Sequence, residues 1–397
     1  MTRSVRSHPD VVIVGAGITG CATALALAEA GARVEVIERY RPAAMASGWT
    51  LAGVRQSGRD PAELLLARTA VEIWQTLDTR LEAPTGYRQG GNLRLARTES
   101  EAETISNLVK SQTTAGLPME LLDSHQAREI APALAEDFLL ASWCPSDGHA
   151  DPVASVEGFR SAAERLGVQF RTNLGVTSVT TSEIGGLRQF ISLATTDGRI
   201  VAGSALLAAG VQTNTLLAGL DLRIPMTTPM VSVLQSIPLP ASLGPVIGVA
   251  NADLTVRQQI DGRLRFTGGA EYAGAQLDLS DEFPAVHPPA ASLARTIALV
   301  SAVLPMVTQA PIARVWGGLL DLTPDALPVL DGVPGIDGLF VAAGFSGHGF
   351  GIGPAVGQAL ASRILGDTTG LSLNAFSFDR FNDWPETETD GTLMLHG

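Results

Sequence analysis

The sequence predicts a mixed α/β fold, and three parts of the chain carry that prediction. Residues 11–38 have the pattern of a buried strand, a glycine-rich turn, a helix and a second strand. Much of 167–272 consists of short segments with strand-like alternation. Residues 339–365 again combine an apolar strand, a glycine-rich turn and a helix. No internal repeat is present, so we do not expect a repeat architecture.

The first of these segments contains a G-x-G-x-x-G motif made of Gly15, Gly17 and Gly20. In this context the three glycines allow a tight turn, close approach of a pyrophosphate, and close packing of helix on strand. The N-terminus of the following helix supplies free N–H groups and partial positive charge. The motif predicts a dinucleotide site, against the alternative of a βαβ unit with an ordinary glycine-rich turn. The turn residues expected to bind the ligand are Gly15, Ala16, Gly17, Ile18 and Thr19.

Glu38 closes the second strand, where an acid can accept hydrogen bonds from a ribose. Its carboxylate would repel a 2′-phosphate, so NADP is disfavoured even though Arg39 follows it. Both FAD and NAD fit these residues.

The composition limits the classes of function. The 397 residues suffice for two domains or one elaborated domain, and 45% hydrophobic with 17% charged residues suits a compact enzyme. A formal net charge of −13 argues against a nucleic-acid partner. Cys21 and Cys144 lie far apart, so we expect no disulfide, no metal site and a cytoplasmic protein. No segment approaches the length of a membrane span.

Lysine is almost absent from the chain. Lys110 is the only lysine among 27 basic residues, a bias that GC-rich coding would produce. Any function that requires a lysine must therefore use Lys110 or be missing.

The middle of the chain adds a candidate binding loop. Residues 41–58 place Trp49 and Arg55 among small residues that let backbone approach a ligand, although a surface loop anchored by the tryptophan is the alternative. Asp60 and Pro61 are typical of a helix start, and a helix is expected to about Leu81. Further helices are expected over 99–114, 124–134, 153–166, 289–303 and 355–365, and strands over 138–145, 168–171, 176–179, 187–195, 199–201 and 205–210 with a hairpin over 258–266.

The glycine-rich junction at 344–354 bears on the choice of ligand. One ligand held by both ends of the chain would explain two such junctions. NAD in a simple Rossmann domain needs no second junction, whereas a longer ligand with a second polar head does.

With these motifs the chain resembles the D-amino-acid oxidase superfamily of FAD-dependent oxidoreductases. It is most similar to the branch of sarcosine oxidase, glycine oxidase and hydroxyproline or opine dehydrogenase flavosubunits. The matching pieces are the glycine motif with Glu38, the loop 46–48, the strand end 208–210, the segment 323–325 and the loop 344–350. They span nearly the whole chain in the order typical of the family. The resemblance therefore implies FAD.

The resemblance also implies two interleaved domains. A Rossmann-like FAD-binding domain of the glutathione-reductase type would combine 1–88, 150–222 and 331–372. A β-sheet-based substrate domain would combine 89–149 and 223–330, followed by a polar tail, 382–397. Amides at the start of the last helix would stabilise negative charge on the flavin. The further residues implied at FAD are Arg39, Ser47, Gly53, Val54, Val176, Ala209, Gly210, Gly344, Ser346, Gly347, His348, Gly349, Phe350 and Gly351.

The implied substrate is a small amino acid or N-alkyl amino acid of the sarcosine, glycine, D-amino-acid or D-proline type. Its α-carbon would give hydride to flavin N5, and water would hydrolyse the resulting imine. Arg55 would bind the carboxylate bidentately, unless it forms a structural salt bridge. His348 would act beside the flavin, unless it only braces its loop. Further candidates to line the substrate pocket, or merely to pack, are Trp49, Arg257, Glu271, Tyr272 and Trp316.

Departures from the family pattern concern FAD attachment and the electron acceptor. Gly318 stands about where sarcosine oxidases attach FAD through a cysteine, so noncovalent FAD is expected. The lysine that they use for oxygen has no counterpart in 257–272, although Arg265 could substitute. We therefore expect electrons to pass to a quinone or a partner subunit. The alternatives are a true oxidase producing H2O2, a flavoprotein that modifies a macromolecule such as RNA, which the acidic charge disfavours, and a non-catalytic flavin-binding subunit.

Overall fold

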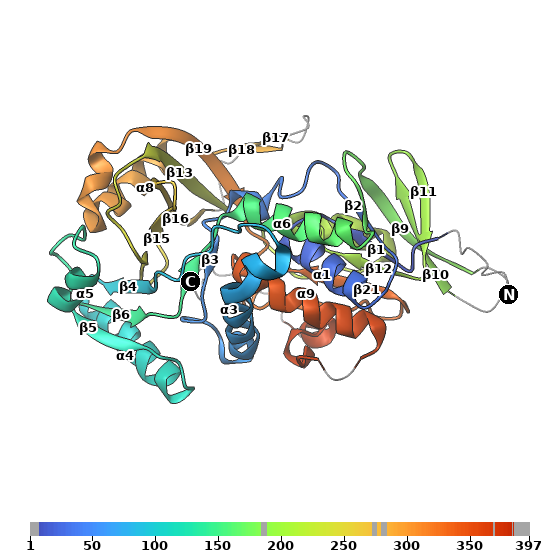
Figure 1. Cartoon of the computed structure of the whole chain (residues 1–397), viewed down its shortest axis with the longest axis horizontal. Helices are drawn as coiled ribbons and strands as arrows, with labels where there is room; N and C mark the ends of the chain where they lie inside the picture. The colour runs from blue at the N-terminus through green and yellow to red at the C-terminus, as the bar shows by residue number, and fades with distance from the viewer. Residues whose placement is uncertain are drawn as a thin grey trace.

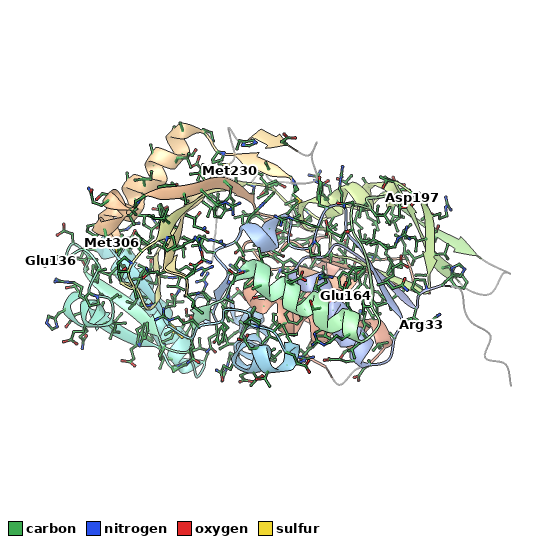
Figure 2. The ribbon with its side chains drawn as sticks, turned by 45° about the horizontal axis from the view of Figure 1, so that its top comes forward. Arg33, Glu136, Glu164, Asp197, Met230 and Met306 are labelled. Atoms are coloured by element: carbon green, nitrogen blue, oxygen red, sulfur yellow. The ribbon has the colours of Figure 1, made fainter. Side chains whose placement is uncertain are left out.

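The computed structural model describes residues 8–183, 189–271, 276–278, 284–367, 370–382 and 384. Two lobes, each built on one large β-sheet, lie side by side along the long axis (Figure 1). Glu136 and Met306 lie toward one end of the molecule, and Arg33 and Asp197 lie toward the other (Figure 2). Most of the predicted polar tail, 382–397, lies outside the described residues.

The first large sheet collects strands from distant parts of the chain. Its order is β20-β21-β12-β1-β2-β8, and only the pair β20–β21 is antiparallel. The strands are β1 (Val11–Val14), β2 (Val34–Ile37), β8 (Gln169–Arg171), β12 (Ser204–Leu207), β20 (Val329–Gly332) and β21 (Leu339–Ala343). Because a parallel sheet is covered on both faces, β1 is apolar throughout.

The two faces of this sheet are covered by different layers. Val11 and Ile13 of β1 pack into a core shared with helices, whereas Val12 and Val14 pack into a second core under a small antiparallel sheet. The helices are α1 (Ile18–Glu29), α3 (Pro61–Leu81), α6 (Pro152–Arg165) and α9 (Gly349–Leu365). The opposite layer contains β9 (Val176–Glu183), β10 (Gln189–Thr195), β11 (Gly198–Ala202), η1 (Gly210–Gln212), α7 (Thr213–Leu217) and η2 (Ala218–Leu220).

The second large sheet forms the other lobe. Its order is β19-β13-β16-β15-β14-β4-β6-β5, with β14 and β4 as its parallel pair. The strands are β4 (Asn92–Ala96), β5 (Glu120–Asp123), β6 (Leu140–Cys144), β13 (Met230–Pro238), β14 (Val246–Val249), β15 (Leu254–Gln258), β16 (Arg263–Glu271) and β19 (Ile312–Leu319). The helical segments of this lobe are α4 (Glu99–Thr114), α5 (Ser124–Ile130), α8 (Ala290–Val303) and η3 (Pro305–Gln309).

Short elements complete the fold. β3 (Gly53–Val54) pairs with β7 (Gly148–His149) between the lobes (Figure 1). The remaining elements are α2 (Ala46–Trp49), β17 (Gln276–Asp278), β18 (Ala285–His287), η4 (Asn374–Phe376) and η5 (Phe378–Phe381). Within the described ranges, no helix has both the length and the apolar composition needed to cross a membrane.

Two predicted helix boundaries are wrong for physical reasons. The helix expected to start at Ala355 begins at Gly349 and contains Pro354. Its first turns are held by close packing that only glycine allows: a Cβ at Gly353 would lie 2.8 Å from Ile18 of α1. The helix expected to reach residue 134 ends at Ile130. Pro132 disfavours helical backbone at the residue before it, which stops the helix there.

Candidate active site

A cavity of about 400 Å³ lies between the two large sheets and brings most of the predicted site residues together. Its wall includes Gly15, Gly17, Ile18, Thr19, Glu38, Arg39, Ser47, Trp49, Gly53, Arg55, Val176, Ala209, Gly210, Arg257, Ser346, Gly347, His348, Gly349 and Phe350. The predicted residues that do not line it are Ala16, Val54, Glu271, Trp316, Gly344 and Gly351. Tyr272 lies outside the described residues.

One end of the cavity is the glycine-rich turn between β1 and α1. Gly15 has φ +109°, and a Cβ there would lie 2.3 Å from the Ala208 carbonyl oxygen, so the turn requires glycine. Glu38 accepts hydrogen bonds from the amides of Ala16 (2.7 Å) and Tyr40 (2.8 Å), while burial raises the pKa of this carboxyl. The first turn of α1 leaves amides available for an anion. This end fits the ADP part of a dinucleotide.

The loop before α9 forms another part of the wall. Asp321 holds it by accepting a hydrogen bond from the Gly344 amide at 2.8 Å, and burial raises the pKa of Asp321 to about 6. Gly347, Gly349 and Phe350 line the cavity at the start of α9. The partial positive charge of this helix start therefore acts at the cavity, as expected for a site that stabilises a ligand's negative charge.

His348 forms a buried pair with Glu63, which lies in the first turn of α3. Nδ1 of His348 is 3.2 Å from Oε2 of Glu63. Burial of Glu63 is outweighed by His348 and Arg59, which lower its pKa to about 2. Burial and Arg59 lower the pKa of His348 to about 4, despite Glu63. At neutral pH the carboxylate is therefore charged and the imidazole neutral.

This pair fixes the tautomer of His348. A carboxylate only accepts hydrogen bonds, so Nδ1 must carry the proton and donate it. Nε2 is then unprotonated, and it has no hydrogen-bond partner within the described residues. His348 lines the cavity, and its Nε2 is a buried acceptor without a partner.

Arginines gather on the same wall. Arg55 is half-buried, and its guanidinium makes no hydrogen bond to any described residue. Burial, Arg59 and Arg94 lower the pKa of Arg55 well below its usual range. Arg59 and Arg94 are 5% and 8% exposed and line the cavity as well. Burial lowers the pKa of Arg94 to about 10. Arg55 is therefore free to bind an anion.

Arg257 occupies a separate position on β15. Its Nη1 donates to Nδ1 of His149 at 3.0 Å, and burial and Arg265 lower the pKa of Arg257 to about 9. Nε and Nη2 of Arg257 are buried without partners among the described residues. Burial, Arg257 and Arg88 lower the pKa of His149 to about 2, so His149 stays neutral as the acceptor.

The model of the DAO family, FAD-dependent oxidoreductases, matches residues 10–363. The chain belongs to the DAO family. FAD is accordingly its cofactor, and the NAD alternative falls away. The chain is an FAD-dependent amino-acid or amine oxidoreductase.

Individual relatives agree with the family. The chain is 28% identical over 408 residues to sarcosine oxidase subunit beta of Arthrobacter sp, covering 98% of this chain and 93% of that protein. It is 24% identical over 387 residues to 4-methylaminobutanoate oxidase (formaldehyde-forming) of Paenarthrobacter nicotinovorans, covering 95% of this chain. It spans 46% of that enzyme's length.

Solved DAO-type structures confirm the predicted fold. Glycine oxidase from Geobacillus kaustophilus has a TM-score of 0.85 at 23% identity, covering 94% of this chain and 99% of that one. L-proline dehydrogenase from P. horikoshii has a TM-score of 0.85 at 25% identity, covering 94% and 98%. The mixed α/β fold therefore combines an FAD-binding domain with a β-sheet substrate domain.

Two residues expected in the pocket of this DAO-family chain are used elsewhere. Nε1 of Trp316 donates to the Trp49 carbonyl oxygen at 3.1 Å, which ties β19 to α2. Glu271 accepts from Oγ of Ser292 at 2.6 Å and pairs with Arg295 at 3.3 Å. Neither side chain lines the cavity, although the partner of Trp316, Trp49, does.

The sequence prediction missed Glu63, Arg59, Arg94 and His149. A signal for Glu63 was present, because a charged residue at 63 shares the apolar face of its helix with Ala67 and Trp74. The sequence also contained a signal for Arg94. It alternates along β4 with Leu93 and Leu95, which belong to the core on the other face of the sheet, so Arg94 faces away from that core.

Proposed function

We propose that the chain oxidises the Cα–N bond of a small amino acid or N-alkyl amino acid. The observation that carries the proposal is that a free arginine and an unprotonated histidine nitrogen, Arg55 and Nε2 of His348, share a cavity that continues to the glycine-rich turn. When bound, FAD supplies the acceptor for a hydride from the substrate α-carbon. The amine also loses a proton and becomes an imine, and water hydrolyses the imine to a carbonyl compound and an amine.

The protein's contribution is to bind and orient the substrate. Arg55 would take the carboxylate through two parallel hydrogen bonds. Nε2 of His348 would accept a hydrogen bond from the substrate nitrogen, and because the pKa of His348 is about 4 it would not hold a proton there. Glu63 positions the ring through Nδ1. The start of α9 would stabilise negative charge that develops as hydride leaves the substrate.

The names of the relatives support an amine substrate. Sarcosine oxidase, 4-methylaminobutanoate oxidase and L-proline dehydrogenase are all named for amines or amino acids. Anaerobic mixing of the flavin-loaded protein with a panel of amino acids and N-methyl amino acids tests the proposal. At least one of them should bleach the flavin absorbance, and a panel without any bleaching would contradict amine oxidation.

We expect FAD to be held without a covalent bond. Cys21 and Cys144 are both buried, neither lines the cavity, and burial raises the pKa of both thiols, so no thiolate is available to attack the flavin. Acid precipitation of the protein should leave a colourless pellet and release the flavin into the supernatant. A yellow pellet that retains a flavin-bearing peptide in mass spectrometry would contradict this prediction.

We further propose an electron acceptor other than oxygen. Lys110 is exposed on α4 and is absent from the cavity wall. Arg265, a candidate to replace a lysine, already donates to the Thr50 carbonyl and to Gln235. A quinone or a partner subunit would then take the electrons, and the similarity to a protein named as a beta subunit supports the second.

An air-saturated assay separates this prediction from the oxidase alternative. With a bleaching substrate and a redox dye, dye reduction should be much faster than peroxide formation, because no lysine lines the cavity and its arginines are taken up by the substrate. Stoichiometric peroxide at the full turnover rate would instead identify a true oxidase.

A further inference from the structure

The cavity wall holds more positive charge than one substrate carboxylate needs. Besides Arg39 near the glycine-rich turn, its lining arginines are Arg55, Arg59, Arg94 and Arg257. The acids among the described lining residues are Glu38 and Asp321, and both already accept hydrogen bonds from backbone amides. Neither neutralises the arginines.

Two further buried acids near the cavity, Glu63 and Asp147, already have hydrogen-bond partners. Glu63 pairs with His348, and Asp147 accepts from the Gln56 amide at 2.9 Å and from Ser57. Within the part of the chain that the structure describes, neither acid forms a salt bridge with an arginine. Two buried carboxylates therefore lie near the arginines without binding their guanidinium groups.

Several guanidinium nitrogens consequently lack hydrogen-bond partners, although Nε of Arg59 donates to the Arg55 carbonyl oxygen at 3.5 Å. Nη1 of Arg59 is buried without a partner, and the Arg94 guanidinium makes no hydrogen bond to any described residue. Glu63 and Asp147 offset part of the positive charge through space. Buried guanidinium nitrogens without hydrogen-bond partners still carry a desolvation cost, and arginine cannot escape it by losing its proton. Such an arrangement is stable when an anionic ligand completes it.

Gln112 and Gly58 shape the surroundings of Arg59 and Arg94. The Gln112 side chain of α4 accepts from the Gly58 amide at 2.8 Å and donates to the Arg59 carbonyl oxygen at 3.1 Å. Gly58 has φ +68°, and a Cβ there would lie 2.9 Å from the Arg94 guanidinium nitrogens. The backbone at Arg59 is therefore held by Gln112, and the glycine at 58 leaves room for the Arg94 guanidinium beside it.

The space around this pair suits the far end of a ligand. Arg94 lies opposite Gly248 in the sheet, and Gly248 lies opposite Thr255, so a glycine leaves the wall open beside Arg94. A second cavity of about 330 Å³, bounded by α3 and α4, shares Arg59 and Arg94 with the first. Arg257 lies two strands from Arg94, about 10 Å across the sheet, and already donates to His149.

We propose that the substrate is an amine with two carboxylates, one bound by Arg55 and the second by Arg59 and Arg94. This inference rests on the proposed amine oxidation. The second carboxylate belongs either to the substituent on nitrogen, as in an N-carboxyalkyl amino acid, or to the amino-acid side chain.

Binding of unreactive acids tests the proposal without turnover. The flavin-loaded enzyme is titrated with acetate, succinate and glutarate at constant ionic strength, following the flavin difference spectrum. At least one dicarboxylate should bind about 100-fold more tightly than acetate, because it gains a second charge-assisted contact. Equal affinities in the wild-type enzyme would overturn the proposal whatever the variants do.

Variants then locate the second contact. Arg94→Gln should remove most of the preference for the dicarboxylate while changing acetate binding by less than about threefold. Arg314→Gln changes an exposed arginine of the same sheet, outside the cavity, and should leave both affinities unchanged. An equal loss for both acids in Arg94→Gln would contradict a second subsite.

Turnover assays show whether the second carboxylate is on the nitrogen substituent or on the side chain. They also separate the dicarboxylate proposal from the proposal of amine oxidation. Iminodiacetate and N-methylaspartate are compared with N-methylglycine in the bleaching assay. Preference for iminodiacetate places the second carboxylate on nitrogen, preference for N-methylaspartate places it on the side chain, and preference for N-methylglycine overturns the proposal. Tight dicarboxylate binding without any bleaching would instead refute amine oxidation while keeping the anion subsite.

Discussion

The Arg55→Ala enzyme should bind its amino-acid substrate more weakly by about 2–5 kcal/mol, a factor of roughly 30 to several thousand. The guanidinium of Arg55 is half-buried and makes no hydrogen bond within the described residues, so its available donors are the ones a carboxylate would use. The measurement is KM together with the substrate dependence of anaerobic flavin bleaching. Arg55→Lys should recover only part of the loss, because a lysine cannot bind bidentately.

The stability of the same variant distinguishes binding from a structural role. Arg55 is crowded by Arg59 and Arg94, which lower its pKa after burial. Removing its charge should therefore leave the free energy of unfolding unchanged or raised. A clear loss of stability with an unchanged KM would instead assign Arg55 to a structural ion pair. Arg314→Ala serves as the matched control on the surface.

Glu63→Gln should slow the chemical step by about 10²- to 10⁴-fold, because the imidazole would present the wrong tautomer. A glutamine amide can donate to Nδ1 of His348, which moves the ring proton to Nε2 and converts the free acceptor into a donor. Loss of the carboxylate would also lower the pKa of His348 below its present value of about 4, so the ring would stay neutral. The effect would then report the tautomer and not the charge.

The measurement is the limiting rate of anaerobic flavin bleaching, with KM as a second readout. Glu72→Gln, an exposed position on the same helix, should behave as wild type. The wild-type rate should show no inflection near pH 6.5, the ordinary pKa of histidine, since His348 titrates near pH 4. An unchanged rate in Glu63→Gln would show that His348 only braces its loop.

Local chemistry made the dinucleotide end of the site predictable. The turn at Gly15 needs a positive φ, and Glu38 follows the next strand. The shape of this end therefore depends on residues that are close together in the sequence. The start of α9 was mispredicted because Pro354 is a local signal that packing on α1 overrides. Here the decisive contacts come from a helix more than 300 residues earlier in the sequence.

The substrate end was harder to predict because it depends on register and side-chain partners. Arg94 reaches the wall only because β4 pairs in register with β14, which is set by residues 246–249. Trp316 and Glu271 were plausible pocket residues by type, but Trp49, Ser292 and Arg295 engage them elsewhere. A single side chain produces no repeating pattern in the sequence, so its partner in the folded protein cannot be predicted from periodicity.

The strand order of the first sheet has a consequence for biosynthesis. β1 precedes the other described strands of its sheet, yet β12 and β21, which extend its side of the sheet, follow far later in the chain. At about 5–20 residues per second, the ribosome needs some tens of seconds to deliver them. During that interval the apolar β1 has a free edge, which is a template for aggregation. Rapid synthesis or a chaperone would limit the exposure of this edge until the last strands emerge.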